Sequence, residues 1–341
     1  MPDPILEIRD LTVEFSTEDG IVRAVTGVSY DLLPGEVLGI VGESGSGKSV
    51  SMLTVLGLTP MPPGRVAAGE ALYKGTDLLK MPKKELRNLR GGEMAMIFQD
   101  PMTSLNPVFT IGDQIMEALQ THNPGMKDDA AKARTIELLE SVGVPFAERR
   151  IAQYPHEFSG GMRQRAMIAM AMANNPSVLI ADEPTTALDV TIQAQIVEVI
   201  KAAQEQTHAA IVLITHDLGL IAELADRVVV MYAGRVVEIG DVYTIFESPR
   251  HPYTIGLMNS LARVDADLDK LIPIPGQPPS MISPPPGCAF HPRCAHSQGR
   301  ALCRSEIPAL RAADGAADHR SACHYAEELA GVRAPISTSG A

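Results

Sequence analysis

The sequence predicts an α/β fold in which buried parallel strands alternate with helices. Short apolar runs at residues 37–41, 178–181 and 210–214 have the length and composition of strands that are covered on both faces. Each run ends at a glycine-rich or polar group of residues, and helical patterns follow at 50–58 and 190–206. Because α/β sheets bind ligands beyond the carboxyl ends of their strands, these polar groups are the first candidates for a site.

The composition is that of a globular protein with an aliphatic core. The 341 residues are enough for two domains, and 45% of them are hydrophobic and 21% charged. Aromatic residues make up only 4% and tryptophan is absent, so we expect a core rich in aliphatic side chains and methionine. The net charge of −12 argues against a general nucleic-acid or anionic-lipid surface.

The sequence offers no candidate for a membrane span or an export signal. No apolar run approaches the roughly 20 residues that a membrane-spanning helix needs. Residues 1–4 show neither a basic segment nor the start of an apolar one. We therefore expect a cytoplasmic chain that contacts a membrane only through partner proteins.

The first part of the chain predicts an antiparallel β-subdomain, because apolar and polar side chains alternate along its first strand. The elements that we expect here are strands at 5–15 and 24–33 around a turn at 18–20, a pair of strands at 64–73, a helix at 81–89 and a strand at 94–98. Phe15 ends the first strand, where its ring either stacks on a nucleotide base or belongs to the core.

A glycine-rich segment lies between the strand at 37–41 and the helix at 50–58. It reads Gly42-Glu43-Ser44-Gly45-Ser46-Gly47-Lys48-Ser49 and fits the pattern G-x-x-x-x-G-K-[ST]. Its glycines let successive N–H groups point at phosphate oxygens, and the helix start adds partial positive charge. Lys48 can reach the β- and γ-phosphates, and Ser49 can offer its hydroxyl to Mg²⁺. The segment predicts a P-loop NTPase in which the nucleotide contacts Gly42, Ser44, Gly45, Gly47, Lys48, Ser49 and Val50.

Residues 99–156 contain no strand signal and predict an inserted helical subdomain, with helices at 110–120 and 128–142. Gln99 directly follows the strand at 94–98, at the end where α/β sheets bind ligands. From there it can contact Mg²⁺ or a water near the γ-phosphate, although residue type alone favours a solvated loop glutamine.

Three titratable side chains follow buried strands in the second half of the chain. Asp182 and Glu183 come at the end of one strand, where Asp182 is placed to hold Mg²⁺ and Glu183 to polarise an attacking water. His216 follows the next strand, where its imidazole can donate to the γ-phosphate. The sequence therefore predicts a hydrolytic site at this edge of the sheet.

A serine and two glycines, Ser159-Gly160-Gly161, begin the helix that we expect to run to residue 173. Ser159 suits an N-cap position, and the glycines expose backbone N–H groups. The group is therefore either an anion contact or an ordinary helix cap.

Taken in order along residues 5–245, these features resemble the nucleotide-binding subunit of an ABC transporter. Many NTPases share the glycine-rich loop, whereas a Ser-Gly-Gly helix cap just upstream of an Asp-Glu strand is specific to this family. The resemblance implies a RecA-like core within residues 1–250 that hydrolyses ATP to ADP and phosphate. The chain departs from the family at Met162, where a glutamine is usual, so no polar contact is expected from that position.

The resemblance also implies a head-to-tail dimer that encloses two ATP molecules. In that dimer Ser159, Gly160 and Gly161 of one subunit would bind the γ-phosphate held by the loop of the other. Asp189 would cross the same interface, and Phe15 would stack on adenine.

The last part of the chain holds all four cysteines, Cys288, Cys294, Cys303 and Cys323. They follow strands at 227–232 and 235–239, helices at 241–246 and 251–261, and a proline-rich linker at 272–287. Disulfides are disfavoured in the cytoplasm, so the cysteines predict a 4Fe–4S cluster, a structural Zn²⁺ site or free thiols. Mixed zinc sites remain open because histidines lie nearby, at His291, His296, His319 and His324.

The segment His251-Pro252-Tyr253, the linker and the cysteines together resemble the C-terminal extension of ATPases from oligopeptide, dipeptide and nickel importers. The resemblance implies an extension over 251–330 in which the four cysteines hold a 4Fe–4S cluster, with Zn²⁺ as the alternative. A disordered tail is expected at 331–341.

The family resemblance implies an ATPase that energises the import of di- or oligopeptides at the cytoplasmic face of the inner membrane. Its partners would be a second, related but non-identical ATPase, two transmembrane permease subunits and an extracytoplasmic substrate-binding protein. The alternatives are nickel import, or a non-transport ABC ATPase that acts on nucleic acid through a zinc module. The acidic charge balance counts against nucleic acid as a partner.

Overall fold

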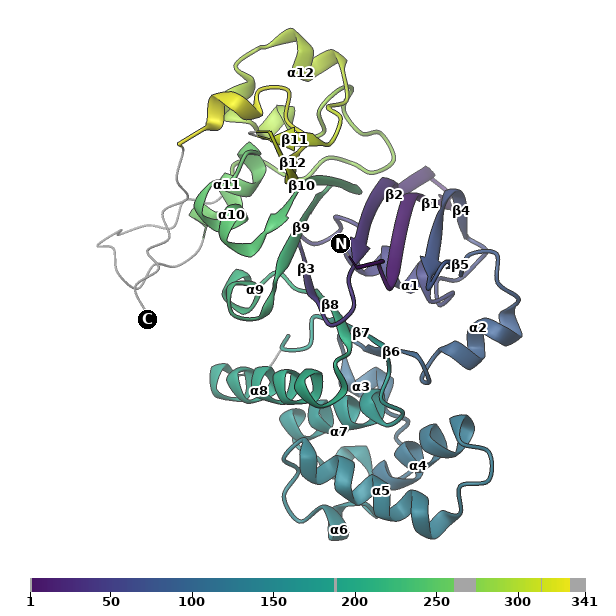
Figure 1. Cartoon of the computed structure of the whole chain (residues 1–341). Coiled ribbons are helices and arrows are strands. Elements are labelled where there is room, and N and C mark those ends of the chain that lie inside the picture. Colours follow the sequence, from purple (N-terminus) through teal and green to yellow (C-terminus); the bar gives the residue numbers. More distant parts are fainter. Residues whose placement is uncertain (1, 187–188, 261–273, 314, 332–341) are drawn as a thin grey trace. The chain divides into compact units, whose positions relative to one another are not determined.

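The computed structural model describes residues 2–186, 189–260, 274–313 and 315–331 (Figure 1). The chain forms two compact units, each assembled from stretches that are separate in the sequence. The first comprises the described residues within 1–5, 32–37 and 80–214, and the second comprises those within 6–31, 38–79 and 215–341. The tail predicted at 331–341 lies, beyond residue 331, outside the described residues, as does Leu261, the predicted end of a helix.

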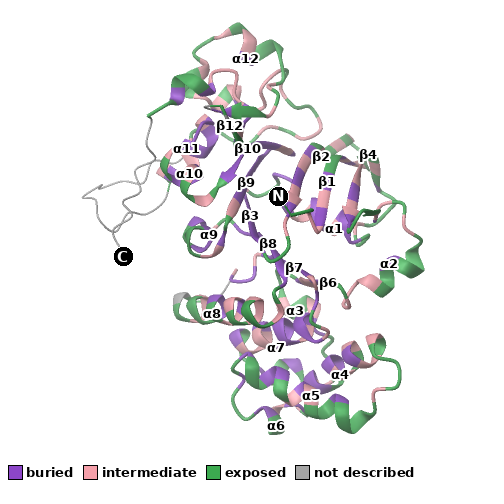
Figure 2. Ribbon diagram, viewed as in Figure 1, coloured by how far each residue is buried: buried purple, intermediate pink, exposed green. Residues whose placement is uncertain are grey.

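The first unit contains three parallel strands, β6 (Met94–Ile97), β7 (Val178–Asp182) and β8 (Ala210–Ile214). β7 lies in the middle, because it pairs with β6 on one side and with β8 on the other. Every residue of β7 and β8 is buried (Figure 2), as expected of parallel strands that are covered on both faces. Since the strands run parallel, the side chains that follow β6 and β7 emerge at the same edge.

Helices make up most of the rest of this unit (Figure 1). Their bounds are α2 (Lys83–Leu89), α3 (Pro101–Ser104), α4 (Ile111–His122), α5 (Asp128–Ser141), α6 (Ala147–Arg150), the 3₁₀ turn η1 (Pro155–Glu157), α7 (Gly160–Met172) and α8 (Val190–Thr207). The prediction of an inserted helical segment is confirmed, since residues 98–177, all of them described, contain no strand. None of the helices in the described ranges combines the length and the apolar character that a bilayer crossing requires.

The start of α4 shows how the sequence sets a helix boundary in this segment. The Thr110 hydroxyl accepts from the Asp113 N–H at 3.1 Å, and the Asp113 carboxylate accepts from the Thr110 N–H at 3.3 Å. This reciprocal pair satisfies two backbone donors that the first turn leaves without partners. The apolar face that follows, including Ile111, Ile115 and Leu119, is buried.

The second unit contains a mixed sheet and an antiparallel one. The mixed strands are β3 (Val37–Val41), β9 (Arg227–Tyr232), β10 (Arg235–Asp241), β11 (Arg311–Ala313) and β12 (Ala316–Ser321), in the order β11-β12-β10-β9-β3. β3 runs parallel to β9, and the other pairs are antiparallel. The helices are α1 (Lys48–Val55), α9 (Leu218–Leu224), α10 (Val242–Glu247), α11 (Pro252–Asn259), α12 (Ala301–Ser305) and the 3₁₀ turns η2 (His291–Arg293), η3 (Ala295–Ser297) and η4 (Ala326–Leu329).

The predicted N-terminal β-subdomain is a four-stranded sheet in the order β2-β1-β4-β5. Its strands are β1 (Leu6–Thr17), β2 (Gly20–Leu32), β4 (Gly64–Tyr73) and β5 (Thr76–Asp77). The prediction of two strands within 64–73 is wrong, because these residues form the single strand β4, which pairs with β1. Gly69 in β4 has φ +100°, and a Cβ added there would lie 2.6 Å from the Leu11 Cα, so glycine accommodates the irregularity in the pairing with β1.

The sequence reasoning missed the hairpin of β11 and β12 in the cysteine-containing region. β12 pairs with β10 through Glu238 opposite Ser321 and Ile239 opposite Arg320, so this region extends the mixed sheet of the second unit. The strands are short and rich in alanine, which has little β propensity, and their pairing depends on a strand far away in the sequence. The C-terminal region is thus part of the same unit as α1.

Candidate nucleotide-binding site

The glycine-rich loop lies between β3 and α1, the strand–loop–helix setting that its pattern requires. Two of its glycines have backbone conformations that disfavour a side chain, Gly42 at φ +152° and Gly47 at φ +97°. An added Cβ would overlap the Met231 carbonyl oxygen at Gly42 and the Ala24 carbonyl oxygen at Gly47. Gly45 has φ +77° but open space around it. A side chain there would be disfavoured by the backbone conformation and not by a clash with a neighbour.

Polar groups inside the loop are arranged to receive an anion. The Lys48 ammonium donates to the carbonyl oxygens of Gly42 and Glu43, at 2.7 and 3.1 Å, and is therefore held over the loop. The hydroxyl of Ser46 is buried and makes no hydrogen bond within the part of the chain that is described. A buried hydroxyl without a partner is costly unless a ligand supplies one, so this atom fits a phosphate oxygen. Sequence reasoning left Ser46 out of the contact set, because the pattern leaves its position unspecified.

In the first unit, the structure brings Gln99 and Glu183 together. The Gln99 amide donates to the Glu183 carboxylate at 3.2 Å, and the Thr186 hydroxyl donates to the same oxygen at 2.7 Å. The backbone of Glu183 has φ +48°, a conformation uncommon for a residue with a side chain. The Ile214 carbonyl at the end of β8 accepts from the Glu183 N–H at 2.7 Å and helps to hold this backbone. Thr186 is a candidate site residue that the sequence did not indicate. It reaches the Glu183 carboxylate only because the chain turns after Glu183.

The other predicted residues of this edge occupy different environments. Asp182 is the last residue of β7 and is buried. His216, in the second unit, is exposed and precedes Asp217, whose carboxylate caps α9. Phe15 is half-buried in β1 and lies opposite Gly64 of β4. Ser49 and Val50 lie half-buried in the first turn of α1, and Ser44 is exposed in the loop.

Ser159 and Asp189 are both N-caps of neighbouring helices. The Ser159 hydroxyl accepts from the Met162 N–H at 3.4 Å at the start of α7, and the Asp189 carboxylate accepts from the Ile192 N–H at 3.0 Å at the start of α8. An added Cβ at Gly161 would lie 2.8 Å from the Ile192 side chain, so the two helix starts touch and Gly161 must be small. Ser159, Gly160 and Asp189 are exposed, and the two caps therefore form one accessible surface of the first unit.

Comparison with known proteins supports the assignment of these elements. Residues 25–186 match the model of the ABC transporter family, and residues 237–303 match that of the oligopeptide/dipeptide transporter C-terminal region. The chain is 54% identical over 294 residues to the oligopeptide transport ATP-binding protein OppD of Bacillus subtilis, over 86% of this chain and 82% of that one. The chain belongs to the ABC transporter ATP-binding proteins.

Two further comparisons bear on this ABC ATPase. It is 52% identical to the dipeptide transport ATP-binding protein DppD of Escherichia coli, over 96% of this chain and 98% of that one. Its fold matches a solved ATP-binding cassette, MJ0796 bound to ADP and phosphate, with a TM-score of 0.62 and 26% identity over 70% of this chain and 98% of that one. The predicted fold class and ATPase activity are therefore confirmed.

The predicted 4Fe–4S cluster is wrong for this ABC ATPase. Cys288, Cys294, Cys303 and Cys323 are free, and no group of three or more Cys, His, Asp or Glu side chains in the described ranges can hold a metal ion. Burial raises the pKa of Cys288 to about 11 and that of Cys323 to about 12, so both thiols stay protonated at neutral pH. The 4Fe–4S prediction is overturned by the lack of a metal-ligand group among the described residues.

Three of the four histidines that kept zinc as the alternative make other contacts. His291 Nδ1 lies 2.9 Å from the Cys288 carbonyl oxygen, His324 Nε2 lies 2.9 Å from the Glu306 carbonyl oxygen, and His319 contacts Glu238. These three rings contact backbone and carboxylate groups, and no group of metal ligands among the described residues supports the zinc alternative.

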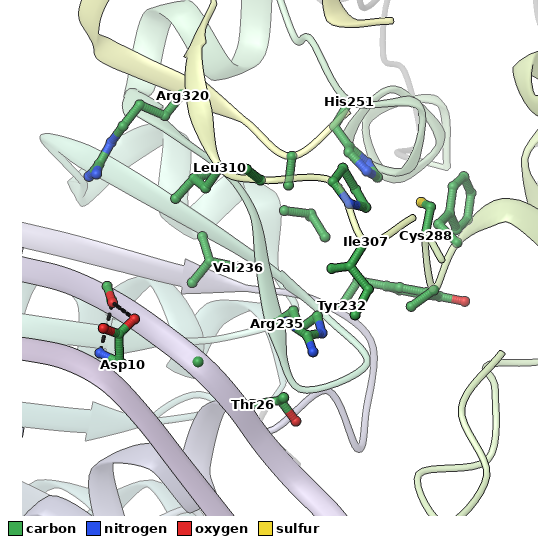
Figure 3. A pocket seen from close by; sticks show the side chains of 18 residues that line it. Asp10, Thr26, Tyr232, Arg235, Val236, His251, Cys288, Ile307, Leu310 and Arg320 are labelled. Carbon is green, nitrogen blue, oxygen red and sulfur yellow. Dashed lines mark hydrogen bonds between the residues drawn. The ribbon is translucent and has the colours of Figure 1, made fainter. Parts of the chain in front are cut away.

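A cavity of about 390 Å³ lies within the second unit, next to this C-terminal region (Figure 3). Its walls come from β1, β2, β9, β10 and β12, from His251 and Ala322, and from residues 288–290 and 307–310, and none of them belongs to the loop at 42–49. Arg235 and His251 both line it, and burial lowers the pKa of each. The cavity is thus separate from the residues assigned to the nucleotide.

His251 gives the ABC ATPase a specific acid sensitivity. It is buried, its Nδ1 accepts from the Tyr253 N–H at 3.1 Å, and burial lowers its pKa from 6.5 to about 3. Between these values the unfolded chain binds a proton that the folded chain does not, so stability falls as the pH drops below about 6.5. We expect His251→Asn, which keeps the cap, to lower this loss by up to about 1.4 kcal/mol per pH unit.

Melting temperatures at pH 7.5 and pH 5.0 measure this effect. The wild type should lose more stability than His251→Asn between the two values, whereas equal losses would show that His251 is not the group that titrates.

Proposed function

We propose that this chain hydrolyses ATP to drive the import of dipeptides or oligopeptides through an ABC transporter. The observation that carries the proposal is the combination of an intact phosphate-binding loop at 42–49 with a C-terminal region that matches the oligopeptide/dipeptide transporter family over 237–303. Relatives that are 52% and 54% identical are named as dipeptide and oligopeptide transport ATP-binding proteins, and this supports peptides as the cargo.

In the proposed mechanism, the loop binds the phosphates and the first unit supplies the hydrolytic groups. Lys48, the loop N–H groups and the buried Ser46 hydroxyl contact phosphate oxygens. Glu183 polarises the attacking water, while Gln99 and Thr186 hold its carboxylate in place. The remaining contacts that we propose are adenine stacking by Phe15, loop contacts by Gly42, Ser44, Gly45, Gly47 and Val50, and a hydrogen bond from His216 to the γ-phosphate.

The nucleotide is proposed to bind together with Mg²⁺, with ligands from Ser49, Asp182 and Gln99. When bound, the ion neutralises charge that develops on the phosphates. The hydroxyl, carboxylate and amide oxygens of these three residues are of the type that Mg²⁺ prefers.

We further propose that two ATPase subunits pair head to tail around ATP. The surface formed by Ser159, Gly160, Gly161 and Asp189 is exposed and made of helix N-termini, which suits a γ-phosphate bound to a second subunit. In an importer the second ATPase would be a related chain, and the remaining partners would be two permeases and a substrate-binding protein. The complex would hold this chain at the cytoplasmic face of the membrane.

We propose a domain organisation in which the nucleotide-binding residues and the C-terminal extension belong to separate parts of the chain. Residues 1–250 form the nucleotide-binding domain, with a helical subdomain at about 99–156, and residues 251–330 form the C-terminal extension. The match to the oligopeptide/dipeptide C-terminal region over 237–303 supports an extension that begins near this point.

Replacing Lys48 tests the ATPase proposal. Lys48→Ala removes the only ammonium group of residues 42–49, so we expect ATP hydrolysis to fall by about a hundredfold or more, the loss typical of one charge-stabilising donor. The release of phosphate by the purified chain, alone and with its permeases, measures the effect. Lys201→Ala is the matched control, because Lys201 makes an exposed pair with Glu198 at 3.5 Å on α8. Equal rates for wild type and Lys48→Ala would remove the loop from the proposed reaction.

A further inference from the structure

Every polar group of Glu43, the second residue of the phosphate-binding loop, makes a hydrogen bond. Its N–H donates to the Tyr253 hydroxyl oxygen at 2.8 Å. Its carboxylate accepts from both terminal nitrogens of Arg293, at 2.7 and 3.0 Å. Its carbonyl oxygen accepts from Lys48, the residue of the loop that the proposed function places on phosphate. Glu43 therefore links the phosphate-binding lysine directly to two residues of the C-terminal region.

Arg293 is fixed in the orientation that this contact needs. Its side chain is only 6% exposed, and each of its five N–H groups has an acceptor. Besides the Glu43 carboxylate, these acceptors are the Pro275 carbonyl at 2.9 Å, the Ile274 carbonyl at 3.3 Å and the Tyr232 hydroxyl at 3.3 Å. A bidentate guanidinium–carboxylate pair with both partners restrained has a defined geometry, unlike a solvated surface pair.

Aromatic rings hold the two contacting residues together. The ring centroids of Tyr232 and Tyr253 lie 4.5 Å apart, and Phe290 packs edge-on against both, at 5.2 and 5.4 Å. The Arg293 guanidinium lies 5.8 Å from the Tyr232 ring and 5.9 Å from the Phe290 ring. Residues from β9, α11 and η2 thus form one cluster beneath Glu43, all within the second unit.

We infer that Tyr253 and Arg293 are positioning residues for the phosphate-binding loop, through which the C-terminal extension sets the affinity for ATP. By fixing Glu43 they hold the carbonyl that orients Lys48 and the start of the turn whose N–H groups face the phosphates. Neither residue touches the nucleotide in this account. The inference rests on the proposed function, because it concerns the same loop.

The coupling works in both directions. If the ordered extension raises the affinity of the loop for ATP by some factor, then bound ATP must favour the ordered extension by the same factor. ATP should therefore slow amide hydrogen exchange in residues 288–297, although the proposed nucleotide contacts lie elsewhere. A role confined to folding would give no such response to a ligand.

The central experiment measures ATP binding by Arg293→Gln with a fluorescent ATP analogue. We expect the dissociation constant to rise at least about fivefold, the lower end of typical coupling between sites. The maximal hydrolysis rate at saturating ATP should change less than twofold, so that the effect appears in KM. Tyr253→Phe, which keeps the ring and removes the acceptor for the Glu43 N–H, should change binding in the same direction.

Two sets of variants isolate the Arg293–Glu43 contact. Arg300→Gln is the matched control, because Arg300 belongs to the same region but contacts Glu328 at 2.8 Å and the Tyr325 ring at 4.0 Å. It should leave ATP affinity within twofold of the wild type. The double variant Arg293→Gln with Glu43→Gln should bind ATP about as weakly as either single variant, because both remove one interaction. Fully multiplicative effects would show that Arg293 does not act through Glu43.

The outcomes separate this inference from the proposed function. A wild type that does not bind ATP would overturn the proposed function. A wild type that binds ATP, together with an Arg293→Gln variant of equal affinity, would overturn the inference alone. Should Arg293→Gln fail to fold, exchange of residues 288–297 in the wild type decides the matter, since no change on adding ATP contradicts the coupling.

Discussion

Replacing Glu183 by glutamine is expected to reduce ATP hydrolysis by about a hundredfold to ten-thousandfold, the range typical of removing a general base. The amide is close in size and can keep the contacts to Gln99 and Thr186, at 3.2 and 2.7 Å in the wild type, but it cannot take a proton from water. ATP affinity should stay within a few-fold of the wild type, because the phosphate-binding groups of residues 42–49 are unchanged. Phosphate release under single-turnover conditions measures the chemical step directly.

A neighbouring carboxylate provides the control for this variant. Glu198→Gln removes an exposed charge on α8 that pairs with Lys201 at 3.5 Å, and it should leave hydrolysis unchanged. Near-normal turnover by Glu183→Gln would exclude Glu183 as the general base. A loss of ATP binding in the same variant would instead mean that Glu183 holds the nucleotide.

Removing the Glu238 carboxylate is expected to destabilise the C-terminal region by at least about 3 kcal/mol, because each buried donor that loses its acceptor costs about 1–3 kcal/mol. Glu238 is fully buried in β10 and accepts from three donors: the N–H groups of Arg250 and His251, the latter at 3.0 Å, and His319 Nε2 at 2.8 Å. It thereby joins β10 to the start of α11 and to β12. Glu238→Ala leaves all three buried donors without an acceptor.

Native-state amide exchange in α11 and β12 measures this loss. Glu238→Ala should accelerate exchange there by a factor of about a hundred to a thousand or more, since about 1.4 kcal/mol corresponds to tenfold. Glu247→Ala, which removes an exposed carboxylate from nearby α10, should have little effect. Unchanged exchange in Glu238→Ala would contradict the role of this carboxylate in holding the region together.

Local patterns allowed the glycine-rich loop and the buried parallel strands to be predicted from the sequence. The loop at 42–49 carries its chemistry in consecutive residues, and buried parallel strands such as β7 have a distinctive apolar composition. The placement of Gln99 near Glu183 followed from topology, because residues after adjacent parallel strands emerge at the same edge.

The parts that could not be predicted depend on contacts between distant residues. Arg293 and Glu43 are 250 positions apart, and nothing in either segment alone indicates that they pair. The buried hydroxyl of Ser46 became a site atom only once its lack of a partner was visible. The cysteine prediction failed for a similar reason, since spacing does not say whether the side chains come together as a metal site, and the described residues contain no such group.

The most direct test is a structure of the Glu183→Gln chain with Mg²⁺ and ATP. In that structure we expect the Lys48 ammonium, oriented by the Glu43 carbonyl, to donate to a phosphate oxygen, with the Ser46 hydroxyl beside it. We also expect Arg293 and Tyr253 to keep their contacts to Glu43. A triphosphate bound away from residues 42–49, without a contact to Lys48, would contradict the account.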